Sequence, residues 1–150
     1  MNPNDDLYQQ VILDHNRKPR NFGSINPCSH QSEGFNPVCG DHLKVYANLD
    51  GDIVQNIMFD GDGCAICKAS ASMMTMAIKG NTKAEAKQKF DEFHRLVLGQ
   101  LKPDSDTHTL GKLAIFSGIW KYPSRVKCAA LAWHTLNAAL DGQESTSTEA

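Results

Sequence analysis

A glycine-rich turn that runs directly into a run of small residues constrains this chain more than any other stretch. The segment Gly61–Met74 reads Gly-Asp-Gly-Cys-Ala-Ile-Cys-Lys-Ala-Ser-Ala-Ser-Met-Met. Gly61 and Gly63 permit positive φ and close backbone approach, and the alanines that follow favour helix. Cys64 should therefore lie at the start of a helix, where unpaired N–H groups and the helix dipole favour a thiolate. The alternative for this stretch alone is a buried structural cysteine beside a tight turn.

Composition indicates a single ordinary globular domain. The chain has 150 residues, 41% hydrophobic and 21% charged, with a formal net charge of -2. Near-neutral charge gives no reason to expect nucleic-acid or membrane binding. No apolar run approaches the roughly 20 residues that span a bilayer, and the N-terminal residues lack a signal-peptide pattern, so we expect a cytoplasmic protein. We expect one domain over residues 1–142 and a disordered tail over 143–150, which is rich in Ser, Thr and Glu and has no apolar anchor.

Hydrophobic periodicity and turn signals predict one β-hairpin and several helices. Residues 43–49 alternate in polarity, Asp50-Gly51 is a strong hairpin turn, and residues 53–59 form the returning strand. Helices are expected from about 64 to 79, from 83 to 98 and from 124 to 140, with another before Pro19. Residues 26–40, which contain two prolines and two glycines, are expected to be a loop.

The cysteines indicate metal or thiol chemistry. Five cysteines, an odd number in a chain expected to be cytoplasmic, argue against a disulfide framework. Cys39 precedes the first hairpin strand and Cys64 follows the second, so an antiparallel hairpin brings them together. Asp41 lies two residues beyond Cys39 on the same strand face. Cys128 is expected in the first turn of the last helix, where the helix dipole favours its thiolate.

Three thiolates and one carboxylate make a tetrahedral site for zinc or for an iron–sulfur cluster. Closed structural zinc sites favour cysteine and histidine, so the carboxylate of Asp41 suggests a site that exchanges a ligand. Cys64-Ala65-Ile66-Cys67 is formally a C-x-x-C motif, but no βαβ pattern precedes it. Cys67 is therefore expected to be a small side chain on the helix near the site, and Cys28 an incidental loop residue.

Four groups of segments, spread over nearly the whole chain, carry a family resemblance. They are Asp14-His15-Asn16 with Pro19-Arg20-Asn21; Asn36-Pro37-Val38-Cys39-Gly40-Asp41; Gly61-Asp62-Gly63-Cys64-Ala65-Ile66 with Ala69-Ser70-Ala71-Ser72-Met73; and Arg125-Val126-Lys127-Cys128-Ala129. These segments resemble the U-type iron–sulfur assembly family, the NifU N-terminal/IscU/SufU proteins. Within it the chain looks like the SufU branch, because Gly111–Trp120 resembles the SufU insertion and Lys127 stands where IscU scaffolds have histidine. Residues 122–127 also lack the Leu-Pro-Pro-Val-Lys chaperone-docking motif of IscU.

The resemblance implies an α+β fold, with a small antiparallel sheet and helices packed on one face. It implies zinc (Zn²⁺) held by the four ligands Cys39, Asp41, Cys64 and Cys128, and a partner, a pyridoxal-phosphate-dependent cysteine desulfurase of the SufS type. Cys39 would take sulfur from the desulfurase persulfide, assisted by Arg125, and pass it to downstream iron–sulfur assembly proteins. Two alternatives remain: a scaffold that assembles a [2Fe–2S] cluster on the same ligands, and a structural zinc module that only binds partners.

Overall fold

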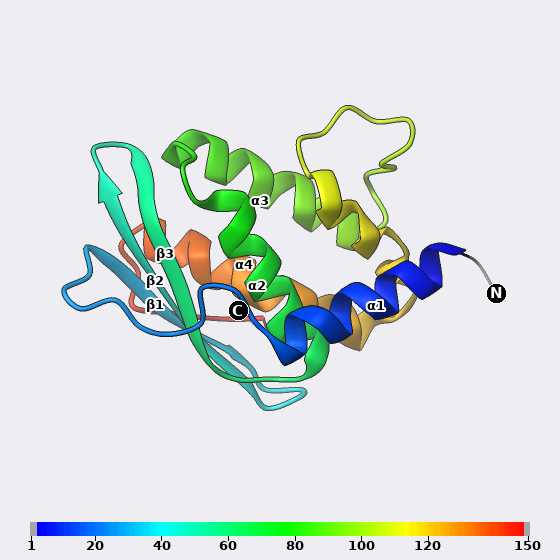
Figure 1. The fold of residues 1–150 in the computed structure, drawn as a ribbon, viewed down its shortest axis with the longest axis horizontal. Coiled ribbons are helices and arrows are strands. Elements are labelled where there is room, and N and C mark those ends of the chain that lie inside the picture. The colour runs from blue at the N-terminus through cyan, green and yellow to red at the C-terminus, as the bar shows by residue number, and fades with distance from the viewer. Residues whose placement is uncertain (1–2, 149–150) are drawn as a thin grey trace.

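A hairpin that forms one side of a four-stranded sheet organises the molecule (Figure 1). The structure, a computed structural model, describes residues 3–148, with side chains from Asp6 onward. The elements in chain order are α1 (Pro3–Arg17), β1 (His30–Asn36), β2 (Asp41–Asp50), β3 (Ile53–Asp62), α2 (Ala65–Ile78), α3 (Lys83–Val97), the 3₁₀ helix η1 (Gly111–Lys121), α4 (Pro123–Leu140) and β4 (Ser145–Ser147). None of the helices in this part of the chain combines the length and apolar character that a bilayer span requires.

The predicted hairpin is confirmed. β2 and β3 pair antiparallel, with Val45 opposite Phe59 and His42 opposite Asp62. The turn between them uses Gly51 at φ 61°, a left-handed conformation that glycine adopts without a steric penalty. Alternate residues of both strands face the helices and are fully buried, among them Leu43, Val45, Ala47, Ile57 and Phe59.

The loop predicted for residues 26–40 is wrong in its middle part, His30–Asn36, which forms β1. β1 pairs antiparallel with β2, from His30 opposite Ala47 to Asn36 opposite Asp41. Its sequence, His-Gln-Ser-Glu-Gly-Phe-Asn, has one large apolar residue and no alternating hydrophobic pattern. The inward positions must be small because α4 packs against them: a Cβ on Gly34 would lie 1.9 Å from Oγ1 of Thr135.

The segment expected to be disordered also contains structure. Ser145–Ser147 form β4, which pairs parallel with Glu33–Phe35 of β1, and the Thr148 amide donates to the Phe35 carbonyl. The sheet order is β3-β2-β1-β4, so the sheet is antiparallel except at this edge. β4 lacks a hydrophobic signal because backbone hydrogen bonds to a sheet edge do not depend on apolar side chains. Residues 149 and 150 lie outside the described part of the chain.

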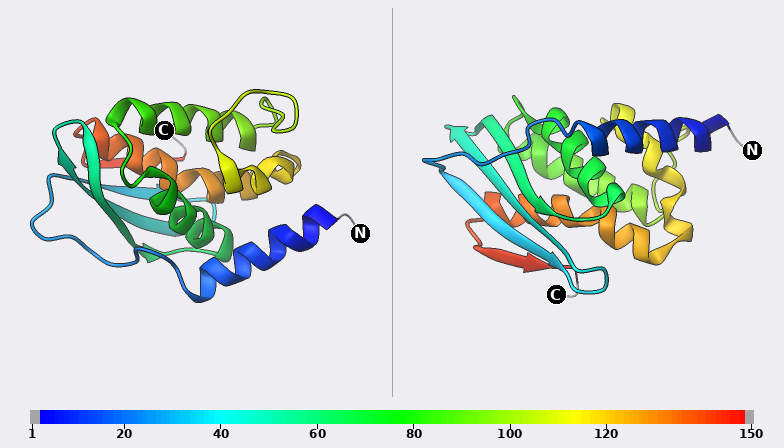
Figure 2. Two further views of the ribbon diagram at one scale, coloured as in Figure 1. Left: turned by 45° about the horizontal axis from the view of Figure 1, so that its top comes forward. Right: turned by 60° about the horizontal axis from the view of Figure 1, so that its bottom comes forward.

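Helices cover one face of the sheet, as expected for the fold class. α4 contacts β1 and β2, α2 contacts β3, and α1 and α3 pack on α2 and α4 respectively (Figure 2). Trp133 of α4 is 1% exposed and stacks on Phe93 of α3 with ring centroids 4.6 Å apart. α3 begins with a capping box, in which the Thr82 N–H donates to the Glu85 side chain and the Glu85 N–H donates to the Thr82 side chain.

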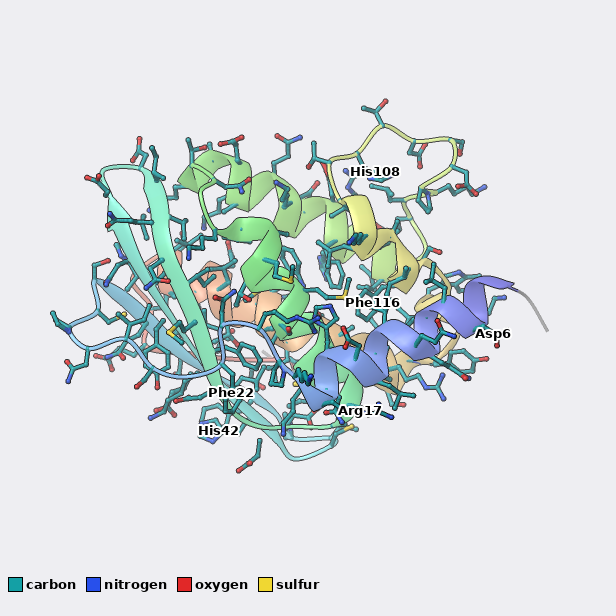
Figure 3. All side chains as sticks on the ribbon, in the orientation of Figure 1. Asp6, Arg17, Phe22, His42, His108 and Phe116 are labelled. Atoms are coloured by element: carbon teal, nitrogen blue, oxygen red, sulfur yellow. The ribbon has the colours of Figure 1, made fainter. Side chains whose placement is uncertain are left out.

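The apolar stretch before α4 forms the long 3₁₀ helix η1. Its buried residues, Leu113, Phe116 and Ile119, recur every three positions, which is the period of a 3₁₀ helix. Phe116 (labelled in Figure 3) is fully buried and meets Tyr8 and Phe93 edge-on. η1 therefore links α1 to α3 and sets the direction in which α4 begins.

Candidate metal centre

Four candidate ligands come from four places in the fold that the hairpin and α4 bring together. Cys39 lies in the turn between β1 and β2, and Asp41 is the first residue of β2. Cys64 follows β3 as the N-cap of α2, with extended backbone. Cys128 lies in the second turn of α4 rather than in its first, although the helix begins at Pro123, close to where the sequence predicted.

The donor atoms of three of these residues form a tight group. One ligand atom each from Cys39, Asp41 and Cys128 all lie within 4.8 Å of one another, and the Sγ atoms of Cys39 and Cys128 are 3.6 Å apart. Cys64 is not part of this mutually close set, but it joins the same cluster through two contacts. Its backbone N–H donates to Oδ1 of Asp41 over 3.1 Å, and its sulfur accepts a hydrogen bond from Cys128.

The cluster has a buried side and an open side. Asp41 and Cys128 are each 4% exposed, whereas Cys39 and Cys64 are exposed. A site with two buried ligands and two solvent-exposed ligands suits a metal centre at which one ligand exchanges. A closed structural zinc site would have four protected ligands.

The thiolate of the cluster belongs to Cys64. The hydrogen bond from Cys128, followed by the N–H of Cys67, lowers the pKa of Cys64 to about 6. The same hydrogen bond, together with burial, raises the pKa of Cys128 well above its ordinary value. The thiolate predicted at Cys128 from a first-turn position is therefore wrong, because the residue lies deeper in α4 and donates a proton to Cys64.

Alkylation of metal-free protein should show this lowered pKa directly. We expect the rate at which iodoacetamide modifies Cys64 to rise with pH and to reach half its maximum near pH 6, because only the thiolate reacts. For an ordinary thiol the half-maximal rate lies near pH 8.5. Mass spectrometry of the tryptic peptides over pH 5 to 9 measures it. Cys64→Ser should remove this low-pH phase. A midpoint near pH 8.5 would contradict the hydrogen-bonding arrangement.

The donor set fits zinc. A tetrahedral zinc with Zn–S bonds of about 2.3 Å separates neighbouring sulfurs by about 3.8 Å, close to the 3.6 Å between Cys39 and Cys128. Thiolate and carboxylate are both common zinc ligands, and three cysteines with one carboxylate supply four. The same set also suits a small iron–sulfur cluster, which is held mainly by thiolates.

Comparison with known proteins shows the family of this chain. The family of the NifU-like N-terminal domain matches residues 7–141. The chain belongs to this family. It is 42% identical over 140 residues to the zinc-dependent sulfurtransferase SufU of Bacillus subtilis (strain 168), covering 93% of each chain. It is 37% identical over 134 residues to the iron–sulfur cluster assembly scaffold protein IscU of Streptococcus pyogenes serotype M1, covering 89% of this chain and 82% of that protein.

A solved structure supports the same family and fold. A SufU from the thermophile Fervidobacterium islandicum AW-1, described as a candidate iron–sulfur cluster assembly scaffold protein for the SUF system, superposes with a TM-score of 0.82. It is 36% identical and covers 87% of this chain and 94% of that one. The α+β fold and the family resemblance inferred from the sequence are both confirmed.

Asn36 is a residue of this NifU-like domain that sequence reasoning did not assign to the site. It is fully buried, and its Nδ2 lies 3.4 Å from Oδ2 of Asp41 and 3.7 Å from Sγ of Cys128. Its Oδ1 accepts a hydrogen bond from Thr148, just beyond β4. Asn36 is thus a positioning residue for two candidate ligands. Its position in the Asn-Pro-Val-Cys-Gly-Asp segment was the only available signal.

Tyr8 of α1 also borders the centre. Burial raises the pKa of Tyr8, and the charges of Arg125, Cys64 and Cys128 also affect this pKa. Its hydroxyl is buried and has no hydrogen-bond partner among the described residues. No local pattern in the sequence links Tyr8 to the cysteines, which lie on other elements.

Arg125 lies on the open side of this NifU-like domain. It is exposed, and its guanidinium carbon lies 4.5 Å from the ring centroid of Tyr122, a cation–π contact. The structure does not pair it with a candidate ligand. Its charge opposes the burial-driven rise in the pKa of Tyr8, a residue that the thiols of Cys64 and Cys128 also affect.

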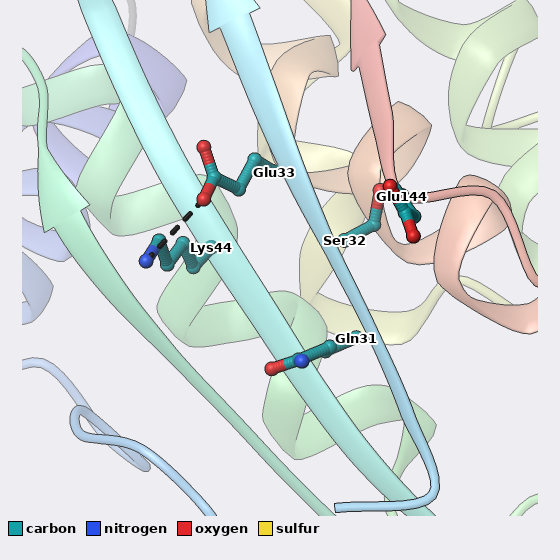
Figure 4. A pocket seen from close by; sticks show the side chains of 5 residues that line it. All are labelled: Gln31, Ser32, Glu33, Lys44 and Glu144. Atoms are coloured by element: carbon teal, nitrogen blue, oxygen red, sulfur yellow. Dashed lines mark ion pairs between the residues drawn. The ribbon is translucent and has the colours of Figure 1, made fainter.

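Two hollows among the described residues contain none of the candidate ligands. The first, of about 260 Å³, lies over β1 and β2 beside the C-terminal segment, where Glu33 pairs with Lys44 (Figure 4). Another, of about 680 Å³, is lined by parts of α1, α2 and η1, including His15. His15 itself is 8% exposed, and its Nδ1 lies 2.7 Å from Oγ of Ser72, so its ring is held against α2.

Proposed function

We propose that this chain is a zinc-dependent sulfurtransferase that accepts persulfide sulfur from a SufS-type cysteine desulfurase for iron–sulfur cluster assembly in the cytoplasm. The observation that carries the proposal is the cluster of Cys39, Asp41 and Cys128 beside Cys64, with Cys39 on its open side. The similarity to the zinc-dependent sulfurtransferase SufU of Bacillus subtilis supports it.

The four ligands we propose for zinc are Cys39, Asp41, Cys64 and Cys128. Bound zinc would keep the thiols deprotonated at neutral pH and, being redox-inert, would leave their sulfur chemistry unchanged. Three of these ligands are anchored by regular structure: Asp41 begins β2, Cys64 caps α2 and Cys128 is inside α4. Their donor atoms are further held by Asn36 and by the Cys64 amide.

Cys39 is the ligand that can leave. It lies in an exposed turn outside any strand or helix, and the next residue, Gly40, has φ 73°. Such a turn swings outward with little disturbance to the core, whereas moving Cys128 would disrupt α4. We therefore assign Cys39 as the nucleophile that receives sulfur.

The transfer step is a thiol exchange. The Cys39 thiolate attacks the outer sulfur of the desulfurase persulfide, R–S–SH, where R–S is the desulfurase cysteine. A bond forms between the Cys39 sulfur and that outer sulfur, and the original S–S bond breaks. The electron pair leaves with the desulfurase thiolate, and Cys39 becomes a persulfide. No electrons are gained or lost overall.

We propose that Arg125 assists this step electrostatically. Its permanent charge lies on the exposed rim of α4 near the cluster, held over Tyr122. A guanidinium at that rim stabilises the anionic sulfur that leaves the persulfide. Arg125 would also form an ion pair with an acidic group of the docked desulfurase.

The second candidate function is a scaffold for a [2Fe–2S] cluster. Its support is the same donor set, in which the thiols of Cys39 and Cys128 lie close together beside Cys64, and the similarity to the scaffold IscU of Streptococcus pyogenes. A scaffold must hold iron and sulfide, whereas the proposed transferase holds zinc and carries sulfur on Cys39.

Metal content and sulfur transfer separate the two functions. Protein purified without oxygen should be colourless, contain about one zinc per chain, and take up radiolabelled sulfur from cysteine when mixed with a SufS-type desulfurase. Elemental analysis, a visible spectrum and non-reducing gels measure these properties. Brown protein with stoichiometric iron and sulfide, able to pass a cluster to an apo-ferredoxin, would instead establish the scaffold.

A further inference from the structure

The C-x-x-C motif of this chain has an unequal pair of thiols at the start of α2. Cys64 is the N-cap and is exposed, whereas Cys67 lies one turn later and is fully buried. The Cys67 backbone N–H donates to Sγ of Cys64 over 3.4 Å. An exposed cysteine that can attack and a protected cysteine that can resolve are the two parts of a dithiol that forms a disulfide reversibly.

The side chain of Cys67 lies on the side of the helix that faces the turn. A Cβ on Gly63 would be 2.9 Å from Sγ of Cys67 and 3.5 Å from Oδ1 of Asp41, so the thiol packs against the turn that leads to Cys64. Residues one helical turn apart have Cα atoms about 5 to 6 Å apart, within the range that a disulfide bridges. Gly63 leaves the room that this pair needs.

We propose that Cys64 and Cys67 form a reversible disulfide, which makes them an oxidation site that withdraws Cys64 from the metal centre. The disulfide itself stands on the geometry of α2. Its consequence for zinc rests on the proposed function, in which Cys64 is a ligand.

The reaction needs an oxidant, for which we name a low-molecular-weight disulfide, R–S–S–R. The Cys64 thiolate attacks one sulfur, forms a mixed disulfide and releases R–S⁻, which takes up a proton. Cys67 then loses its proton and attacks Sγ of Cys64, which expels the second R–S⁻. The protein dithiol loses two electrons and two protons, and R–S–S–R becomes two R–SH.

Zinc binding and this oxidation should oppose each other. A disulfide sulfur is not a thiolate ligand, so oxidation leaves Cys39, Asp41 and Cys128 as the remaining donors and weakens zinc binding. By linkage, bound zinc must protect Cys64 from the oxidant to the same degree. The competing oxidation product is a disulfide between Cys39 and Cys128, whose Sγ atoms are 3.6 Å apart.

The test exposes reduced protein to oxidised glutathione, in zinc-loaded and in metal-free form. Peptide mapping identifies the disulfide, and a chromogenic chelator follows zinc release. The variants are Cys67→Ser and Cys67→Ala, which remove the resolving thiol, and Cys28→Ser, which removes a thiol outside the cluster. Circular dichroism and the zinc content of each reduced variant must match the parent protein.

We expect an intrapeptide disulfide between Cys64 and Cys67 in the parent protein and in Cys28→Ser. Both Cys67 variants should form no such disulfide and should instead accumulate the mixed disulfide between Cys64 and glutathione. Absence of the Cys64–Cys67 disulfide from the oxidised parent protein, or Cys39–Cys128 as the main product in metal-free protein, overturns the proposal. If the purified protein binds no zinc, the proposed function fails, and mapping of the metal-free protein still decides whether the dithiol exists.

Discussion

Replacing Cys39 by serine should reduce sulfur uptake from the desulfurase by at least about 1,000-fold. A serine hydroxyl remains protonated at neutral pH and cannot act as the thiolate nucleophile that attacks a persulfide. The substitution lies in an exposed turn, so the free energy of unfolding in the metal-free state should change by less than about 0.5 kcal/mol. Radiolabel retained on the protein in non-reducing gels measures the uptake.

Cys28→Ser is the matched control for this variant. Cys28 is a free cysteine at the other end of β1, where its Sγ lies 2.8 Å from the His30 carbonyl, and it is not among the proposed ligands. The Cys28→Ser variant should accept sulfur at the rate of the parent protein. Normal uptake by Cys39→Ser would show that another cysteine receives the sulfur, and would move the nucleophile to Cys64 or Cys128.

Replacing Cys128 by serine should weaken zinc binding by on the order of 100-fold. Structural zinc contributes about 10–16 kcal/mol in small domains, so one ligand of four accounts for about 3 kcal/mol. The effect should exceed that of Cys39→Ser on zinc, because Cys128 is buried and its sulfur contacts both Cys39 and Asn36. Competition with a chelator of known affinity measures it, and zinc-loaded protein should show a lower thermal midpoint.

Asp62→Asn provides the control for the zinc measurement. Asp62 is an exposed carboxylate at the end of β3, opposite His42 and outside the cluster. The zinc affinity of the Asp62→Asn variant should equal that of the parent protein. Unchanged affinity in Cys128→Ser would exclude that cysteine as a ligand. If chelation unfolded the protein while Asp41→Ala left sulfur uptake unaffected, the zinc would instead be purely structural.

Most of the frame around the site could be predicted because it depends on local signals. The Asp50-Gly51 turn, the alternation from Leu43 onward and the glycines before Cys64 each act within a few residues. These signals correctly predicted the hairpin and α2, and with them the meeting of Cys39, Asp41 and Cys64. β1 and β4 were missed because each is held by backbone bonds to a neighbouring strand, which leave no pattern in their own residues.

The sequence by itself determined the candidates for the chemistry: an odd set of cysteines, an aspartate two residues after one of them, and a glycine turn that makes Cys64 a helix cap. Only the tertiary structure decided which of those thiols has a lowered pKa and which of those side chains are exposed to solvent. Docking of α4 on the sheet brings Cys128 against Cys64, which lowers the pKa of Cys64 to about 6 and raises that of Cys128. It also buries Asp41 and Cys128 while leaving Cys39 exposed. Burial and hydrogen bonding across distant segments depend on packing, and no local pattern encodes them.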